Sequence, residues 1–420
     1  MTLPASTRAL IANRPFVTLL AARTISMLGM AFSPVALAFG VLRLPGADAG
    51  TLSLVLAAQM GPQVLFMLVG GVVADRYPRA LVLRWGEFLA ATGLGAIGVM
   101  MLVGYAPTVL LCAAAALVGV AAAAVYPALT GIIPDLVPGK DLQQANAWLS
   151  MGASGARLAG LVAGGAFVVW LGGGWAITAA ALLYLIAGVL VMALPSHSHS
   201  LASTEESPLR QLIDGWGEFK SRQWLWVVVL QFSVMIMVLQ AAHGVFGPVV
   251  AEHELGGPAV WTTFLASEAL GAVVGVALSL VWRPRRPILT ATLLTFTSGV
   301  PAILLGVNAP LWSVVIAAFA MGLGFDLFGV WWMTTMQNEV PPASLARVAS
   351  YDALGSLMFG PIGLLLAGPA TLAFGVHKAL VGAGIISIAT TVFALMAPEV
   401  RQLRARVVTQ RQVPDLQSAQ

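Results

Sequence analysis

The hydrophobic residues of this chain form long, almost uninterrupted blocks that are separated by short polar connections. Each block is about as long as the ~20 residues that a helix needs to cross the apolar core of a bilayer. A segment surrounded by lipid must satisfy its own backbone hydrogen bonds, so the blocks predict helices. We therefore expect twelve membrane spans, at residues 15–42, 51–74, 81–103, 107–132, 143–171, 174–194, 224–251, 259–282, 287–307, 310–337, 347–371 and 376–396.

Composition supports this interpretation and narrows the classes of function. Hydrophobic residues make up 59% of the 420 positions and charged residues only 9%, against about 25% charged in soluble domains. The chain has no Walker sequence and no Cys/His cluster with metal-ligand spacing, so we expect no enzyme, no metal and no cofactor. The net charge of +4 is not read as affinity for nucleic acid.

The distribution of basic residues predicts the orientation in the membrane. With twelve spans, 17 of the 21 Lys and Arg residues fall on the side of the termini, two on the opposite side and two inside spans. Because basic loops stay in the cytoplasm, both termini are predicted to be cytoplasmic. The expected location is a bacterial-type cytoplasmic (inner) membrane.

Internal similarity divides the chain into two halves. After a shift of 203 residues, Pro107 meets Pro310 and Gly119 meets Gly322, and further Gly and Pro positions coincide up to Pro195 and Pro398. A parallel repeat of six spans is a common transporter architecture. The predicted units are an N-terminal bundle at 1–194, a cytoplasmic linker at 195–223, a C-terminal bundle at 224–398 and a cytoplasmic tail at 399–420.

The connection after the second span carries a distinctive motif, Gly71-Val-Val-Ala-Asp75-Arg76-Tyr-Pro-Arg79. It resembles the loop signature of the major facilitator superfamily. The resemblance implies an all-α fold of two pseudo-symmetric six-helix bundles. It also implies a cytoplasmic gate at Gly71, Asp75, Arg76 and Arg79, in which Asp75 faces the N-terminus of a helix of the other half.

The fifth span carries small residues at four-residue spacing, which place Gly152, Gly160 and Gly164 on one helix face. Together with Gly165 this stretch is similar to the fifth-helix motif of the superfamily's antiporters, with Leu161 in place of the usual proline. Close packing alone also explains the stripe. The resemblance implies that the partner is the eighth helix.

Two further stretches narrow the resemblance. Residues 133–138 followed by 145–147, and 337–342 followed by 347–348, resemble the exporters of the enterobactin and macrolide efflux type. This subgroup implies export, commonly by proton exchange. The fourth span lacks the arginine that many drug antiporters of the superfamily carry there, which departs from the usual coupling route.

Charged residues inside spans are costly and tend to mark function. The deepest are Arg23, Arg157, Glu268 and Asp326. We expect Asp326 or Glu268 to bind the coupling proton, and Arg157 to pair with Glu268 across the halves. His243 is interpreted first as a hydrogen-bonding helix residue and second as a functional one.

Aromatic side chains in the second half have two readings. Trp261, Phe264, Trp331 and Trp332 are either anchors at the membrane interface or the lining of a pocket.

These observations predict a secondary active exporter of a hydrophobic or amphiphilic small molecule. Its partners would be protons and the lipid bilayer, with no nucleic acid, and we expect a monomer. Two alternatives remain open at this stage: an importer of a nutrient or metabolite on the same fold, and a membrane scaffold or sensor that transports nothing.

Overall fold

The computed structural model describes residues 10, 12–138, 141–195 and 216–405, and it leaves the side chains of 68–76 and of a few other helix residues undescribed. Twelve helices in the described part are long and apolar enough to cross a membrane. The predicted spans are therefore confirmed, with ends that differ by a few residues. The described elements contain no strand.

The first half consists of six continuous helices. They begin and end at local signals such as the Asn13 side chain, which accepts the N–H of Phe16, and Gly104, whose left-handed backbone ends a helix. The helices are α2 (Arg14–Leu42), α3 (Ala49–Arg76), α4 (Arg79–Val103), α5 (Thr108–Leu136), α6 (Leu142–Leu171) and α7 (Gly173–Met192).

The second half has the same number of spans, but three of them are interrupted. Span seven is α9 (Gln223–Ala241), the π-helix η2 (Ala242–Phe246) and α10 (Gly247–Glu254). Span nine is α12 (Pro287–Leu294), the 3₁₀-helix η3 (Thr295–Gly299) and α13 (Val300–Gly306), and span eleven is α15 (Pro342–Leu357) and α16 (Gly360–Phe374). The continuous elements are α11 (Pro258–Val281), α14 (Leu311–Glu339), α17 (Val376–Met396) and the short α18 (Pro398–Gln402).

The short helix α18 belongs to the second bundle. Val400 is fully buried there, and the Glu399 carboxylate accepts the backbone N–H of Trp224 at 3.0 Å. The second bundle therefore extends past residue 398. Most of the predicted linker and tail lies outside the described residues.

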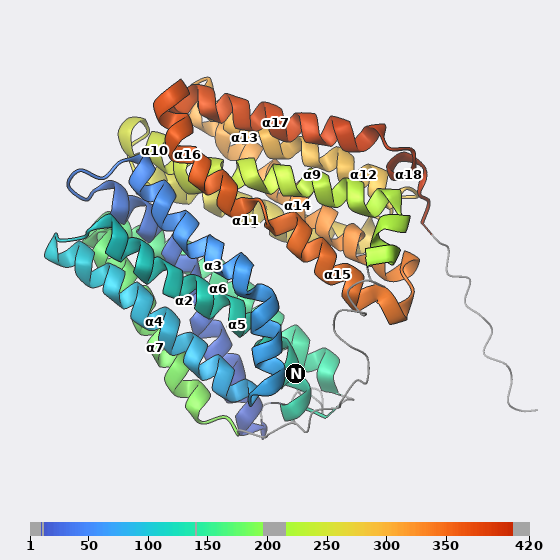
Figure 1. Ribbon diagram of the computed structural model, residues 1–420, viewed down its shortest axis with the longest axis horizontal. Helices are drawn as coiled ribbons and strands as arrows, with labels where there is room; N and C mark the ends of the chain where they lie inside the picture. The colour runs from blue at the N-terminus through green and yellow to red at the C-terminus, as the bar shows by residue number, and fades with distance from the viewer. Residues whose placement is uncertain (1–9, 11, 139–140, 196–215, 406–420) are drawn as a thin grey trace, which may run out of the picture.

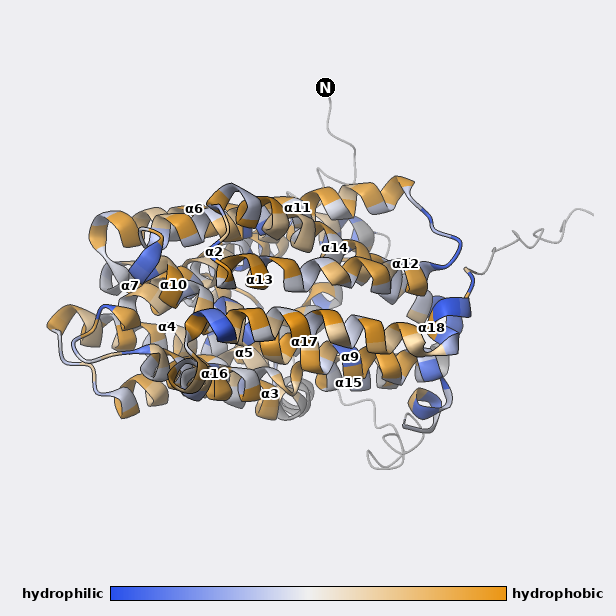
Figure 2. Cartoon of the chain, turned by 90° about the horizontal axis from the view of Figure 1, so that it is seen from above, coloured by the Kyte–Doolittle hydropathy of each residue, from blue (hydrophilic) through white to orange (hydrophobic). Residues whose placement is uncertain are grey.

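The two bundles lie side by side and diverge along their length (Figure 1). We call the end with the α2–α3 connection and α10 the far end, and the end where α2 begins and α18 lies the termini end. In Figure 1 the bundles approach each other at the far end and separate toward α15 and the start of α2. Hydrophobic residues run along the helices and hydrophilic ones gather at their ends, as Figure 2 shows near α18.

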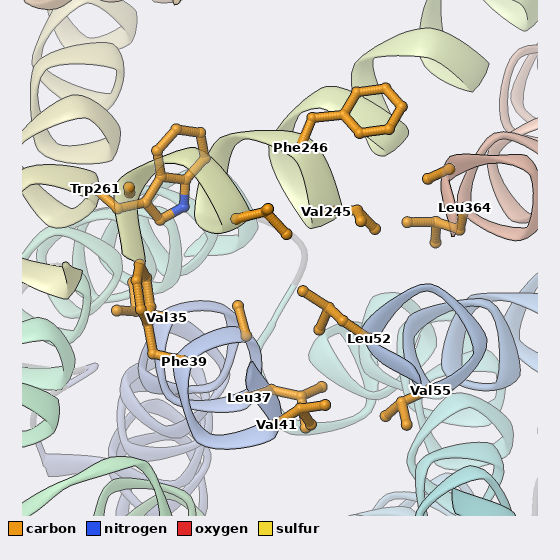
Figure 3. Packing of buried hydrophobic residues seen from close by; sticks show 14 of the residues in the cluster. Val35, Leu37, Phe39, Val41, Leu52, Val55, Val245, Phe246, Trp261 and Leu364 are labelled. Atoms are coloured by element: carbon orange, nitrogen blue, oxygen red, sulfur yellow. The ribbon is translucent and has the colours of Figure 1, made fainter. Parts of the chain in front are cut away.

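The buried hydrophobic residues explain this shape because they form three separate clusters. One cluster joins both halves at the far end; Figure 3 shows α2 and α3 residues such as Val35 and Leu52 facing Val245, Trp261 and Leu364 of the second half. The other two clusters lie at the termini end, and each is confined to one half. The bundles therefore share a core only at the far end.

Candidate functional site

A cavity of about 430 Å³ lies between the two halves, on the termini side of their shared core. The first half contributes residues of α2 and α3, and the second half contributes residues of α9, η2, α11, α15 and α16. The lining is mostly apolar, and its polar members are three glutamines and one histidine: Pro34, Leu56, Gln59, Met60, Gln63, Val64, Met67, Gln240, His243, Gly244, Trp261, Leu265, Leu357 and Leu364.

The π-helix η2 shapes one wall of this cavity. The N–H of Gly247 donates to the carbonyl of Ala242, five residues earlier. Pro248 follows directly and has no N–H to continue the regular helical pattern, which is a local reason for the wider turn. Gly247 also leaves room for the indole of Trp261, which packs directly over it. The wide turn therefore sets His243 in the cavity wall.

His243 lies against two aromatic rings of α11. Its ring centre is 6.2 Å from that of Trp261 and 5.5 Å from that of Phe264, and those two rings stack at 4.6 Å. Trp261 thus lines the cavity, in agreement with the pocket interpretation and not with the interface-anchor interpretation. Trp331 and Trp332 instead pack in the cluster at the termini end of the second bundle.

The ion pair predicted between Arg157 and Glu268 is not what the structure shows. Glu268 Oε2 lies 3.6 Å from His243 Nε2, one helix away in the same half. The positive charge of Arg157 acts instead on the carboxylate of Asp326, on α14 of the other half. Both residues lie inside spans, but position along a helix does not say which face a side chain occupies.

Arg23 lies in a polar group inside the first bundle. Its charge acts on Glu87 of α4, a carboxylate that is only 5% exposed and accepts the hydroxyl of Ser26 at 2.9 Å. These residues do not line the cavity. Arg23 therefore belongs to the interior of the first bundle and not to the cavity wall.

The gate motif is described only in part. Arg79 Nη1 lies 3.2 Å from Asp135 Oδ2, where α4 begins and α5 ends within the first bundle. Gly71, Asp75 and Arg76 belong to the stretch 68–76 of α3, whose side chains are not described. The predicted contact of Asp75 with the second half stays a prediction.

The glycine stripe of α6 faces two different partners. Side-chain atoms added at Gly152, Gly160 and Gly164 would lie 2.6 Å from Thr24, 2.7 Å from Leu28 and 2.8 Å from Phe32, all on α2 of the same half. Gly165, one position further around the helix, packs on Thr262 of α11 in the second half. The expected partner, the eighth helix, therefore contacts Gly165, while the three glycines of the stripe contact α2.

The far end carries contacts between the halves that sequence reasoning missed. Arg43 binds Glu252 through two hydrogen bonds of 2.7 and 3.0 Å. Ser53 donates to the carbonyl of Leu364 and accepts the N–H of Gly368 at 3.2 Å. The available signal was weak: Arg43 is one of only two basic residues on its predicted side.

Comparisons with known proteins agree with this architecture. The sequence profile of the Major Facilitator Superfamily matches residues 16–362. The chain belongs to this superfamily. It is a multi-pass membrane transporter of small molecules and not an enzyme.

Its relatives are distant and functionally mixed. The chain is 28% identical over 273 residues to the uncharacterized MFS-type transporter YvqJ of Bacillus subtilis, a match that covers 63% of this chain and 64% of the relative. It is 24% identical to the multidrug efflux pump Tap of Mycobacterium tuberculosis, covering 92% and 93% of the two chains. It is 26% identical to the lysophospholipid transporter LplT of Salmonella arizonae, covering 79% and 80%.

Solved structures share the fold at lower identity. The nucleoside transporter NupG superposes with a TM-score of 0.71 at 13% identity, covering 93% of this chain and all of the other. The POT family transporter PepTSo gives a TM-score of 0.72 at 11% identity, covering 93% and 98%. These likenesses support the fold alone.

Proposed function

We propose that this transporter exports a hydrophobic or amphiphilic small molecule by proton-driven alternating access. The observation that carries the proposal is the cavity between the bundles, which lies behind a closed far end. If the termini are cytoplasmic, as the basic residues predict, this conformation receives its substrate from the cytoplasm or the inner leaflet.

The lining of the cavity supports the substrate class. Among the described residues the lining contains no Asp, Glu, Lys or Arg, and its polar groups are the amides of Gln59, Gln63 and Gln240 and the imidazole of His243. Methionines complete the wall, and Gln240 Nε2 lies 2.8 Å from the sulfur of Met60 across the halves. Flexible apolar side chains with a few neutral hydrogen-bonding groups suit an amphiphile better than a sugar or an ion.

A second candidate substrate is a single-chain phospholipid. An almost wholly apolar groove of about 400 Å³ runs along α9, α16 and α17 of the second bundle, and Lys378 lies among its lining residues. A groove of this kind suits an acyl chain, with the ammonium group near a phosphate. The relative named a lysophospholipid transporter adds to this alternative.

Inside-out vesicles test the function directly. We expect Nile red, an uncharged amphiphile, to accumulate when the lumen is acidified and to be released by a protonophore. Uptake of a fluorescent lysophospholipid, with no uptake of Nile red, would favour the second candidate. Accumulation that needs ATP and ignores the protonophore would refute both.

A matched pair of variants locates the route. Leu56→Trp fills the cavity. Leu54→Trp places the same ring on the same helix but outside the cavity lining, at a leucine whose side chain is 47% exposed. We expect only Leu56→Trp to abolish Nile red transport. Equal loss in both variants would argue against the cavity as the route.

A further inference from the structure

His243 holds a polar atom that the fold leaves without a partner. Its Nδ1 lies 3.1 Å from the carbonyl of Leu239. A carbonyl only accepts hydrogen bonds, so Nδ1 carries the hydrogen in this contact. In the neutral ring, Nε2 is then an acceptor. Nε2 is buried and makes no hydrogen bond.

This acceptor points at another acceptor. Glu268 Oε2 lies 3.6 Å from Nε2, slightly beyond hydrogen-bond distance. Two acceptors cannot bond to each other, but one added proton makes one of them a donor. The result is an N–H···O bond if the imidazole is protonated, or an O–H···N bond if the carboxylate is protonated. The side chain of Glu268 is the more exposed of the two, at 34% against 23% for His243.

The surrounding elements leave this pair without a closer competitor. Among described residues, no second ion-pair partner of Glu268 or His243 lies within 4 Å. The other ionisable groups on the elements packed around η2 and α11 lie at the far end, on α14 of the same bundle, on α6 of the other bundle, or on the termini side: Arg43, Glu252, His253, Glu254, His377 and Lys378; Asp326; Arg157; Arg14, Arg23, Glu339 and Asp352. The described residues of α9, α13 and α16 add none.

The pair is also connected to the contact between the bundles. Glu268 belongs to α11, the helix whose Thr262 packs on Gly165 of the first half and whose Trp261 lines the cavity. His243 belongs to the adjacent π-turn and lines the same cavity. A hydrogen bond that draws η2 and α11 together would therefore change both the cavity wall and an inter-bundle contact.

We propose that His243 and Glu268 together bind the single proton that this transporter exchanges for its substrate. The proposal rests on the proton-driven export proposed above. The proton arrives from the far side when that side is open, is shared between Nε2 and Oε2, and leaves toward the termini side. No other bond forms or breaks.

Histidine NMR tests the site without transport. The chain has five histidines, and the imidazole resonance of His243 is identified by its loss in His243→Gln. In lipid nanodiscs we expect the chemical shift of this resonance to respond to pH, and we expect that response to change in Glu268→Gln. The matched control is Glu254→Gln. It removes the carboxylate whose Oε1 lies 2.9 Å from Nε2 of His377, at the far end of the same bundle. An unchanged pH response in Glu268→Gln would overturn the shared site.

Transport tests the coupling role. In proteoliposomes, His243→Gln and Glu268→Gln should lose Nile red accumulation against its gradient but retain exchange of Nile red between the two sides. His377→Gln should keep both. Full uphill transport in His243→Gln or in Glu268→Gln would refute the coupling role. If wild-type uptake ignores the proton gradient, the proton-driven function fails, and the NMR titration still decides whether the pair binds a proton.

Discussion

The ion pair between Arg43 and Glu252 should hold the far end of the transporter closed. It joins the end of α2 in the first half to α10 in the second, through two hydrogen bonds of 2.7 and 3.0 Å. The perturbation is Glu252→Gln, which keeps the shape of the side chain and removes its charge. We expect this variant to populate the conformation with an open far end.

The size of the effect follows from geometry and exposure. The two-bond geometry is favourable, but the side chain of Arg43 is 43% exposed and that of Glu252 17%, so water screens the pair. We therefore place its contribution near the upper limit for surface pairs, about 1 kcal/mol. A free-energy change of about 1 kcal/mol shifts the ratio of closed to open molecules about fivefold.

Distances between spin labels measure this ratio. In a Cys112→Ser background, labels at Tyr105 and Trp312 mark exposed positions near the far end of the first and second bundle. Double electron–electron resonance should show a larger long-distance fraction in Glu252→Gln. High salt should move the wild type in the same direction, because it screens the pair.

Two controls make the result decisive. Glu254→Gln removes a neighbouring carboxylate that contacts His377 within the second bundle, so it should leave the distances unchanged. Exchanging the charges, with Arg43→Glu and Glu252→Arg together, should restore part of the closed fraction. Unchanged populations in Glu252→Gln at low salt would refute the reasoning.

Three further predictions address packing, capping and charge. Gly368→Leu should prevent closure of the far end and abolish transport, because even a Cβ there would lie 2.8 Å from the backbone of Gly50; wild-type transport in a folded variant would contradict this. Asp48 caps α3 by accepting the N–H of Thr51 at 2.8 Å, a bond that holds the pKa of its carboxyl below the usual range. Asp48→Ala should therefore lower the free energy of unfolding by about 1 kcal/mol, measured in detergent, and the difference should vanish as the pH falls through the lowered pKa of the folded state. Finally, because the charge of Arg157 acts on Asp326, Arg157→Asp and Asp326→Arg should each impair transport and together recover part of it. A double variant no better than the single ones would count against a functional interaction of the two charges.

Much of the architecture is readable from local sequence. Lipid forces each apolar block to satisfy its own backbone, so hydropathy alone predicts twelve helices and their limits to within a few residues. The repeat of Gly and Pro predicts two bundles for the same reason, because these residues act on their own backbone. The interruption at η2 was not predicted, although Gly247 and Pro248 stand in the sequence as its local cause.

Pairings between side chains required the tertiary structure. The sequence placed both Arg157 and Glu268 inside spans, but the rotation of each helix sets Glu268 beside His243, while the charge of Arg157 acts on Asp326. The stripe of Gly152, Gly160 and Gly164 was visible as a packing face, yet only the fold shows that it meets α2. Glycines at four-residue spacing predict that another helix packs closely, but they do not identify that helix.

The sequence by itself thus determined the membrane class, the number of helices and the superfamily, because each depends on properties of single segments in a fixed solvent. Tertiary structure alone decided that the bundles share a core at the far end only, that Arg43 meets Glu252 there, and that a histidine faces a carboxylate beside the cavity. Those features depend on how segments more than 200 residues apart, such as Arg43 and Glu252, are rotated against each other. Nothing in the hydropathy of either segment encodes that rotation.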